Sequence, residues 1–125
     1  YRKEVLNILK NYKNIIILTG APKVIAKEIV EILPKDIKQN VVSIIGTELE
    51  IRDGKYTGNV IKHPFGLEKY KIVNEIKNYD FDGMGDTIAD IPFLIACKKK
   101  YFISRNIWFD QIIRLFSKDI IFIKR

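Results

Sequence analysis

The fold of this chain is decided by the stretch Ile15-Ile16-Ile17-Leu18-Thr19-Gly20-Ala21-Pro22, in which a continuous apolar run is followed by a polar interruption. The β-branched run predicts a short buried strand, and Pro22 is well placed to start a helix. Apolar residues at helical spacing then continue from Val24 until Pro34. The stretch therefore predicts a strand, a loop and a helix in that order, and the apolar spacing of Val5 to Leu9 predicts a further helix before them.

The same alternation continues downstream. A second buried strand is expected at Val41 to Ile45, and Asp53-Gly54 predicts a hairpin that spans residues 48–60 and projects from the sheet. Helix and strand are then expected in turn over Gly66 to Lys77, Tyr79 to Met84, Ile88 to Cys97, Tyr101 to Ile103, Ile107 to Phe116 and Ile120 to Ile123. This pattern predicts an α/β fold, a Rossmann-like three-layer sandwich with a mostly parallel sheet, as a single domain over residues 1–125.

Composition excludes several classes of protein. No apolar stretch approaches the roughly 18 residues of a membrane span, and the first residues lack the pattern of a secretory signal peptide, so a cytoplasmic protein without a membrane partner is expected. The single Cys97 and the single His63 leave no internal disulfide and no zinc cluster. A formal charge of +7 suits an anionic partner, but the basic residues are scattered apart from Lys98-Lys99-Lys100. Nucleic acid is therefore not the expected partner.

The segment Gly85-Asp86-Thr87-Ile88-Ala89-Asp90 places two carboxylates four residues apart across a predicted strand-to-helix turn. Magnesium in proteins is usually held by one or two carboxylates together with waters and phosphate oxygens. Asp86 is therefore the candidate direct ligand, and Asp90 the candidate for indirect or water-mediated support. The alternative is an ordinary turn, in which Thr87 caps the helix and Asp90 lies in its first turn, where negative charge is favourable.

Two further positions suit a phosphate group. Thr19 and Gly20 lie between a strand and a helix, where a hydroxyl and free backbone N–H groups can hold an anion. An ordinary capping threonine is the alternative. Lys69 comes three residues after Gly66, near the start of a predicted helix, and its ammonium group would help to neutralise a phosphoryl group. Lys71 is the alternative bearer of that charge.

The order of these motifs, Thr19-Gly20, then Gly66 to Lys69, then Gly85 to Asp90, resembles the haloacid dehalogenase-like (HAD) hydrolase superfamily. The run from Gly46 to Gly58, with Gly46-Thr47-Glu48-Leu49-Glu50-Ile51-Arg52-Asp53-Gly54 at its start, is similar to the phosphoserine phosphatase-like branch. The resemblance extends from about Ile15 to the last expected strand.

The resemblance implies a magnesium-dependent phosphatase that hydrolyses a small phosphorylated metabolite through an aspartyl-phosphate. By this comparison Thr19 and Gly20 would bind the phosphoryl oxygens, and Lys69 would stabilise the nucleophile and the transferring group. Asp86 would bind Mg²⁺, and Asp90 would support that metal site. Positioning and charge neutralisation carry most of the work in phosphoryl transfer, so these residues form the supporting apparatus of the reaction.

The family's nucleophile, which lies in an Asp-x-Asp motif after a first strand, has no counterpart in residues 1–14. The segment Asp80-Phe81-Asp82-Gly83 has the same letters, but it occupies the place of the strand that leads to Asp86, and Asp and Gly cluster where chains bend. We therefore expect the nucleophile, the first strand and the specificity-determining cap to lie outside this chain, and we predict that the chain alone is inactive. The alternative is a catalytically inactive HAD-like domain with a binding or scaffolding role.

A second resemblance concerns Gly83-Met84-Gly85-Asp86 together with Pro92 to Tyr101. These residues are similar to the HAD-like region of plant glycerol-3-phosphate acyltransferases, where that region accompanies an acyltransferase domain. The comparison tempers the expectation of phosphatase activity. Within and near this region, Cys97 and Trp108 are predicted to be core residues on amphipathic helices.

Overall fold

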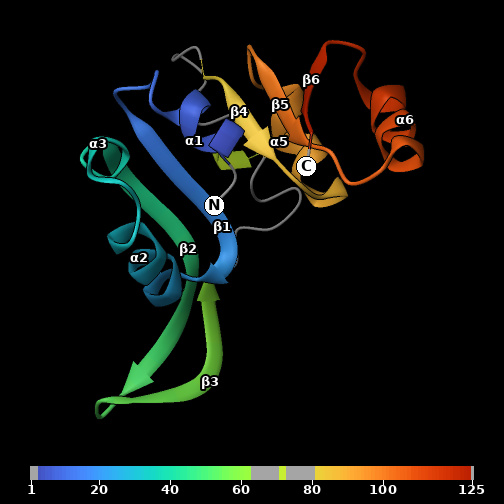
Figure 1. The fold of residues 1–125 in the computed structure, drawn as a ribbon. Coiled ribbons are helices and arrows are strands. Elements are labelled where there is room, and N and C mark those ends of the chain that lie inside the picture. The colour runs from blue at the N-terminus through green and yellow to red at the C-terminus, as the bar shows by residue number, and fades with distance from the viewer. Residues whose placement is uncertain (1–2, 63–70, 73–80, 125) are drawn as a thin grey trace. The chain divides into compact units, whose positions relative to one another are not determined.

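The computed structural model describes residues 3–62, 71–72 and 81–124 of the chain, and Figure 1 shows them as a coloured ribbon. The chain divides into two compact units, Tyr1–Pro64 and Phe65–Arg125. Each unit contains its own three-stranded sheet, and each is described by itself. The expectation of a single domain over residues 1–125 stays a prediction.

The first unit follows the expected order of helix, strand, helix, strand and hairpin. Its sheet has the order β1-β2-β3, in which β1 pairs with β2 in parallel and β2 pairs with β3 antiparallel. A short helix that the sequence did not predict begins after Pro34. The elements are α1 (Lys3–Leu9), β1 (Ile15–Pro22), α2 (Lys23–Glu31), α3 (Lys35–Lys38), β2 (Val41–Arg52) and β3 (Lys55–Lys62).

The predicted hairpin is confirmed. Strand β2 runs past the end of its ladder with β1 and continues into the hairpin, which extends away from α2 in Figure 1. Asp53 and Gly54 occupy the turn with positive φ angles of 51° and 75°. Two successive residues of this kind define the turn whose twist matches that of the flanking strands. The Asp-Gly pair therefore encodes this part of the fold locally.

The expectation that β1 and the start of β2 are buried strands is wrong in part. Ile15 is the only buried residue of β1, and Val42 in β2 is 59% exposed. Strand β1 lies at the edge of its sheet, and α2 is a helix of nine residues that contacts both strands. Each strand is therefore covered only in part within this unit.

The second unit contains an all-parallel sheet with the order β4-β5-β6. Phe102 in β5 is fully buried, and its ring centroid lies 6.0 Å from that of Phe109 and 6.1 Å from that of Phe122. These aromatic pairs hold the last helix against the last two strands. The elements are β4 (Gly83–Gly85), a 3₁₀ turn (Ile88–Asp90), α5 (Ile91–Ile95), β5 (Lys100–Ile103), α6 (Ile107–Phe116) and β6 (Ile120–Ile123).

The strand expected at Tyr79 to Met84 is shorter and shifted, since β4 covers only Gly83–Gly85. Asp82 lies before the strand because its Oδ1 accepts a hydrogen bond of 3.2 Å from the Lys99 backbone N–H. A side chain that bonds the backbone in this way competes with strand pairing. Tyr79 and Asp80 lie outside the described residues.

Of two further predicted helices, one is shorter than expected and the other falls largely outside the described residues. The helix expected over Ile88 to Cys97 begins as a 3₁₀ turn, which the hydrogen bond from the Asp90 N–H to the Thr87 carbonyl oxygen closes, and its α-helical part covers only Ile91 to Ile95. The helix expected over Gly66 to Lys77 lies outside the described residues, apart from 71–72, which are helical.

Cys97 and Trp108 have opposite outcomes as predicted core residues. Cys97 is buried, although it follows α5 and does not lie on it, and burial raises the pKa of its thiol to about 11. Trp108 is 75% exposed, so its assignment to the core is wrong. Helix α6 buries Ile113 against the sheet, and at 100° per residue Trp108 falls on another face. The apolar positions of α6 are thus more numerous than the packed face can cover.

The predicted α/β fold class is confirmed. Of the described strand pairs, β1–β2, β4–β5 and β5–β6 are parallel, and only the hairpin pair β2–β3 is antiparallel. Among the helices in the described ranges, none has the length and apolar character that crossing a membrane requires. The cytoplasmic location stays a prediction.

Candidate active site

The segment Gly85 to Asp90 forms a closed turn at the carboxyl end of β4. Asp90 is 4% exposed, and its Oδ2 accepts three hydrogen bonds. The donors are the Asp86 N–H at 3.0 Å, the Thr87 N–H at 3.2 Å and the Thr87 hydroxyl at 3.3 Å. Because a carboxylate that accepts backbone N–H groups makes strong hydrogen bonds, Asp90 fixes the path of the chain through this turn.

Gly85 permits this closure because no side chain stands between the strand and Asp90. A Cβ atom added at Gly85 would lie 2.6 Å from the Asp90 Cβ and 3.0 Å from its Cγ. A Cβ contact of 2.6 Å is shorter than real Cβ atoms make, so a larger residue would displace Asp90. The close approach accounts for glycine at the last position of β4.

The two predicted metal-site residues therefore have different environments. Asp86 is exposed at the end of β4, and its backbone N–H is tied down by Asp90. The Asp90 oxygen is already committed to three donors, which suits support of the turn rather than direct contact with a cation. Within the ranges the structure describes, no group of three or more His, Cys, Asp or Glu side chains could together hold a metal. Asp86 is therefore the described carboxylate of this turn that could serve as a direct ligand.

Thr19, Gly20 and Ala21 lie within β1, in an irregular segment where the register with β2 shifts, which we call the loop. Leu18 pairs with Ile45 and Pro22 pairs with Thr47, so between these two pairs β1 has two more residues than β2. Thr19 Oγ1 accepts a hydrogen bond of 3.1 Å from the Ala21 N–H. The extra residues project Thr19 to Ala21 out of the regular ladder.

The loop leads directly into the N-terminus of α2. Pro22 occupies the capping position, and no side chain among the described residues caps the helix by a hydrogen bond. The first backbone N–H groups of an α-helix have no partner inside the helix, and with the helix dipole they favour an anion. The loop and the helix start therefore offer donors of the type that a phosphoryl group accepts.

Thr47 also lies in this region, and although it belongs to the run from Gly46 to Gly58, it was not predicted to be a site residue. Its side chain is 6% exposed, and its hydroxyl donates a hydrogen bond of 2.5 Å to the Gly20 carbonyl oxygen. A Cβ atom at the neighbouring Gly46 would lie 3.0 Å from the Ala21 carbonyl oxygen, so the loop packs directly on β2 here. The only signal in the sequence was a small residue and a hydroxyl at the end of a strand, and its partner lies 27 positions away.

The structure brings Asp86 and Asp90 together in one turn of the second unit, and Thr19 and Gly20 together in one loop of the first. Lys69 lies outside the described residues. Lys71, its alternative, is exposed in a helical segment. The roles assigned to these residues stay predictions.

No protein-family model and no curated protein sequence matches the chain. Among solved structures, the chain is similar to the unliganded crystal structure of a probable phosphoserine phosphatase from Vibrio cholerae. The TM-score is 0.53 with 14% sequence identity, and the match covers 97% of this chain. The fold is HAD-like. The chain spans 46% of the length of the Vibrio cholerae protein, and at this identity the similarity concerns the fold alone.

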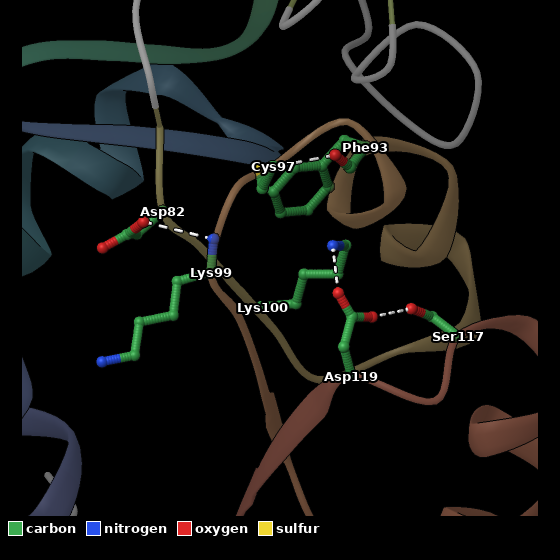
Figure 2. Close-up of polar contacts among 7 residues, drawn as sticks. All are labelled: Asp82, Phe93, Cys97, Lys99, Lys100, Ser117 and Asp119. Atoms are coloured by element: carbon green, nitrogen blue, oxygen red, sulfur yellow. Dashed lines mark hydrogen bonds and ion pairs between the residues drawn. The ribbon is translucent and has the colours of Figure 1, made fainter.

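Asp82 is the second aspartate of Asp80-Phe81-Asp82, which has the same letters as the Asp-x-Asp motif of the HAD-like hydrolases. Asp80 lies outside the described residues. Figure 2 shows Asp82 next to Lys99, beside a group that contains Lys100, Ser117 and Asp119. Asp82 precedes β4, Lys100 begins β5 and Asp119 precedes β6, so this group lies at the amino ends of parallel strands. Asp86 follows the opposite end of β4. Since ligands of open parallel sheets bind at the carboxyl ends of the strands, Asp82 lies at the opposite end of β4 from the expected ligand site.

The carboxyl end of β5 carries a further cationic residue, which was not predicted to belong to the site. The Ser104 hydroxyl donates to Asp110 Oδ2 at 2.5 Å, and Asn106 Oδ1 accepts the Phe109 N–H at 2.8 Å, which together anchor the start of α6. Between them, the Arg105 guanidinium lies 5.4 Å from the centroid of the Phe109 ring. Arg105 is thus held at the same edge of the sheet as Asp86.

Proposed function

We propose that this chain forms most of the core of a magnesium-dependent HAD-like phosphatase that hydrolyses a small phosphorylated metabolite through an aspartyl-phosphate. The aspartate nucleophile lies outside this chain. The observation that carries the proposal is the closed Gly85 to Asp90 turn, in which Asp90 accepts three hydrogen bonds and leaves Asp86 exposed at the carboxyl end of a parallel strand. The HAD-like fold adds a context in which this turn is expected to serve phosphate chemistry.

The donor chemistry of the turn fits Mg²⁺. Asp86 supplies a hard carboxylate oxygen, and Asp90 restrains the backbone that carries it. Magnesium keeps several waters and is commonly bound through one or two carboxylates plus substrate phosphate, so one ligand from this turn is enough for a part of the site. When bound, the ion would neutralise charge on the phosphoryl group.

The remaining residues bind and neutralise the phosphoryl group. The Thr19 hydroxyl and the first N–H groups of α2 donate hydrogen bonds to its oxygens, in a loop that β2 holds in place. Lys69, with Lys71 as the alternative, supplies a positive charge next to the attacked phosphorus. Each of these interactions stabilises the negative charge of the transition state and so lowers its free energy. None of these residues forms a covalent bond with the substrate.

The test is hydrolysis of p-nitrophenyl phosphate by the full-length gene product, with and without added Mg²⁺. We expect hydrolysis that depends on Mg²⁺, and none from residues 1–125 alone because they lack the nucleophile. Magnesium-independent hydrolysis would contradict the proposed metal site. A full-length protein that folds but hydrolyses neither this ester nor small phosphorylated metabolites would favour the alternative, a catalytically inactive HAD-like domain with a binding or scaffolding role.

A further inference from the structure

The peptide between Gly20 and Ala21 is held at both of its polar ends. Its carbonyl oxygen accepts the Thr47 hydroxyl at 2.5 Å, and its N–H donates to Thr19 Oγ1 at 3.1 Å. A trans peptide is planar, so its C=O and N–H point in opposite directions and rotate together. A hydrogen bond that fixes the carbonyl therefore also fixes the direction of the N–H.

This arrangement determines what the Thr19 hydroxyl can do. A hydroxyl has one proton to donate and two lone pairs that accept. Because the Ala21 N–H occupies a lone pair of Thr19 Oγ1, the Thr19 proton points elsewhere and can be donated to an anion. If the peptide rotated by half a turn, the Gly20 carbonyl would face Thr19 instead and would take up that proton.

Two features of the loop make Thr47 the group that opposes this rotation. Gly20 itself has no side chain that restricts rotation of the peptide. Thr47 is buried on β2, in register with Pro22, so its hydroxyl is fixed by the strand pairing of β1 and β2. Gly46 permits the contact because a side chain there would meet the Ala21 carbonyl oxygen and the Lys23 Cα.

We propose that Thr47 is a positioning residue that acts through the Gly20–Ala21 peptide to keep the Thr19 hydroxyl proton available to a phosphoryl oxygen. The inference rests on the proposed function, since it assumes that Thr19 binds phosphate. Thr47 itself need not touch the substrate.

The test uses residues 1–125 labelled with ¹⁵N and the variants Thr47→Val, Thr47→Ser and Thr57→Val. Amide hydrogen exchange at Ala21 reports the peptide, and titration with inorganic phosphate, followed at the amides of Thr19 to Ile25, reports the anion site. In Thr47→Val we expect Ala21 exchange to rise and phosphate affinity to fall, each about tenfold, as one lost hydrogen bond allows. Thr47→Ser keeps the hydroxyl and should restore both. Thr57→Val removes an exposed hydroxyl of the hairpin and should change neither.

The two readouts separate failure of the inference from failure of the proposed function. Unchanged Ala21 exchange in Thr47→Val, or a Thr47→Ser variant that behaves like Thr47→Val, would overturn the inference even if the protein binds phosphate. Absence of phosphate binding by the unmodified chain would overturn the phosphate role of Thr19. The exchange data would still decide whether Thr47 holds the peptide.

Discussion

The Gly85 to Asp90 turn begins at the end of the parallel strand β4, whereas the Thr19 to Ala21 loop interrupts the parallel strand β1, and the two are built differently. In the turn, all three donors to Asp90 Oδ2 come from residues within four positions. In the loop, the Gly20 carbonyl is held by Thr47, 27 positions further along the chain. The turn can therefore form from its own sequence, whereas the loop depends on the correct register of two strands.

The largest effect should come from crowding the local turn with Gly85→Ala. The new Cβ would lie 2.6 Å from the Asp90 Cβ, so Asp90 must move and its hydrogen bonds must weaken. We expect a loss of about 3 kcal/mol in the free energy of unfolding. Urea denaturation followed by circular dichroism measures it.

Gly58→Ala is the control for this variant. Gly58 has a positive φ of 88°, but a Cβ there meets nothing within 4 Å, so only backbone strain is added. Strain of this kind costs about 1 to 2 kcal/mol. If Gly85→Ala cost no more than Gly58→Ala, the close packing of Gly85 on Asp90 would not be a determinant of the turn.

Asp90→Ala should have the next largest effect. It removes the acceptor for the Asp86 and Thr87 N–H groups without adding bulk, and hydrogen bonds to a charged group contribute about 1.5 to 3 kcal/mol. We expect a loss of about 2 kcal/mol together with faster exchange at the Asp86 and Thr87 amides. Asp36→Ala, which removes an exposed partner of Lys10, is the matched control and should cost under about 1 kcal/mol. Equal losses in the two variants would contradict the role of Asp90.

The same difference in construction explains what could be predicted from the sequence. The turn, the Asp53-Gly54 hairpin and helix α6 depend on spacings within a few residues, and the structure agrees with each of them. The contact between Thr47 and Gly20 could not be predicted because it depends on the register of β1 and β2. Trp108 was misassigned because an apolar pattern on a helix does not say which part of a broad apolar face packs on the sheet.

Thr19→Val tests the loop by itself. Valine has a similar shape but accepts no hydrogen bond, so the Ala21 N–H loses its partner. We expect a loss of about 1 kcal/mol in the free energy of unfolding, less than for Asp90→Ala, because one hydrogen bond is lost instead of three. Thermal unfolding provides the measurement, with Thr57→Val as the control. If Thr19→Val lowered the free energy of unfolding as much as Asp90→Ala does, the loop would be held as strongly as the turn, which would contradict the comparison.

The smallest effect concerns the pair of buried Lys100 and exposed Asp119 at the amino ends of the second sheet (Figure 2), which joins two distant residues as the Thr47 contact does. Hydrogen bonds from Lys100 and Ser117 lower the pKa of Asp119 from 3.8 to about 2. The stability that this carboxylate contributes is therefore present above pH 3.8 and is lost as the pH falls toward 2. Asp119→Asn should slightly reduce the free energy of unfolding at pH 7. It should also make that free energy fall less steeply as the pH is lowered from 3.8 toward 2. If the free energy of unfolding fell equally steeply with pH in Asp119→Asn and in the unmodified chain, the pairing would be contradicted.

The central claim is that Asp86 presents a carboxylate to Mg²⁺ from the closed turn, and it is tested most directly by the turnover of Asp86→Asn in the full-length gene product. We predict that kcat for p-nitrophenyl phosphate at saturating Mg²⁺ falls by about a hundredfold or more, since removal of a group that organises transition-state charge has costs of this order. Asp82→Asn, at the opposite end of β4, should stay near the unmodified rate. Normal turnover by a folded Asp86→Asn variant, at an unchanged Mg²⁺ requirement, would contradict the account.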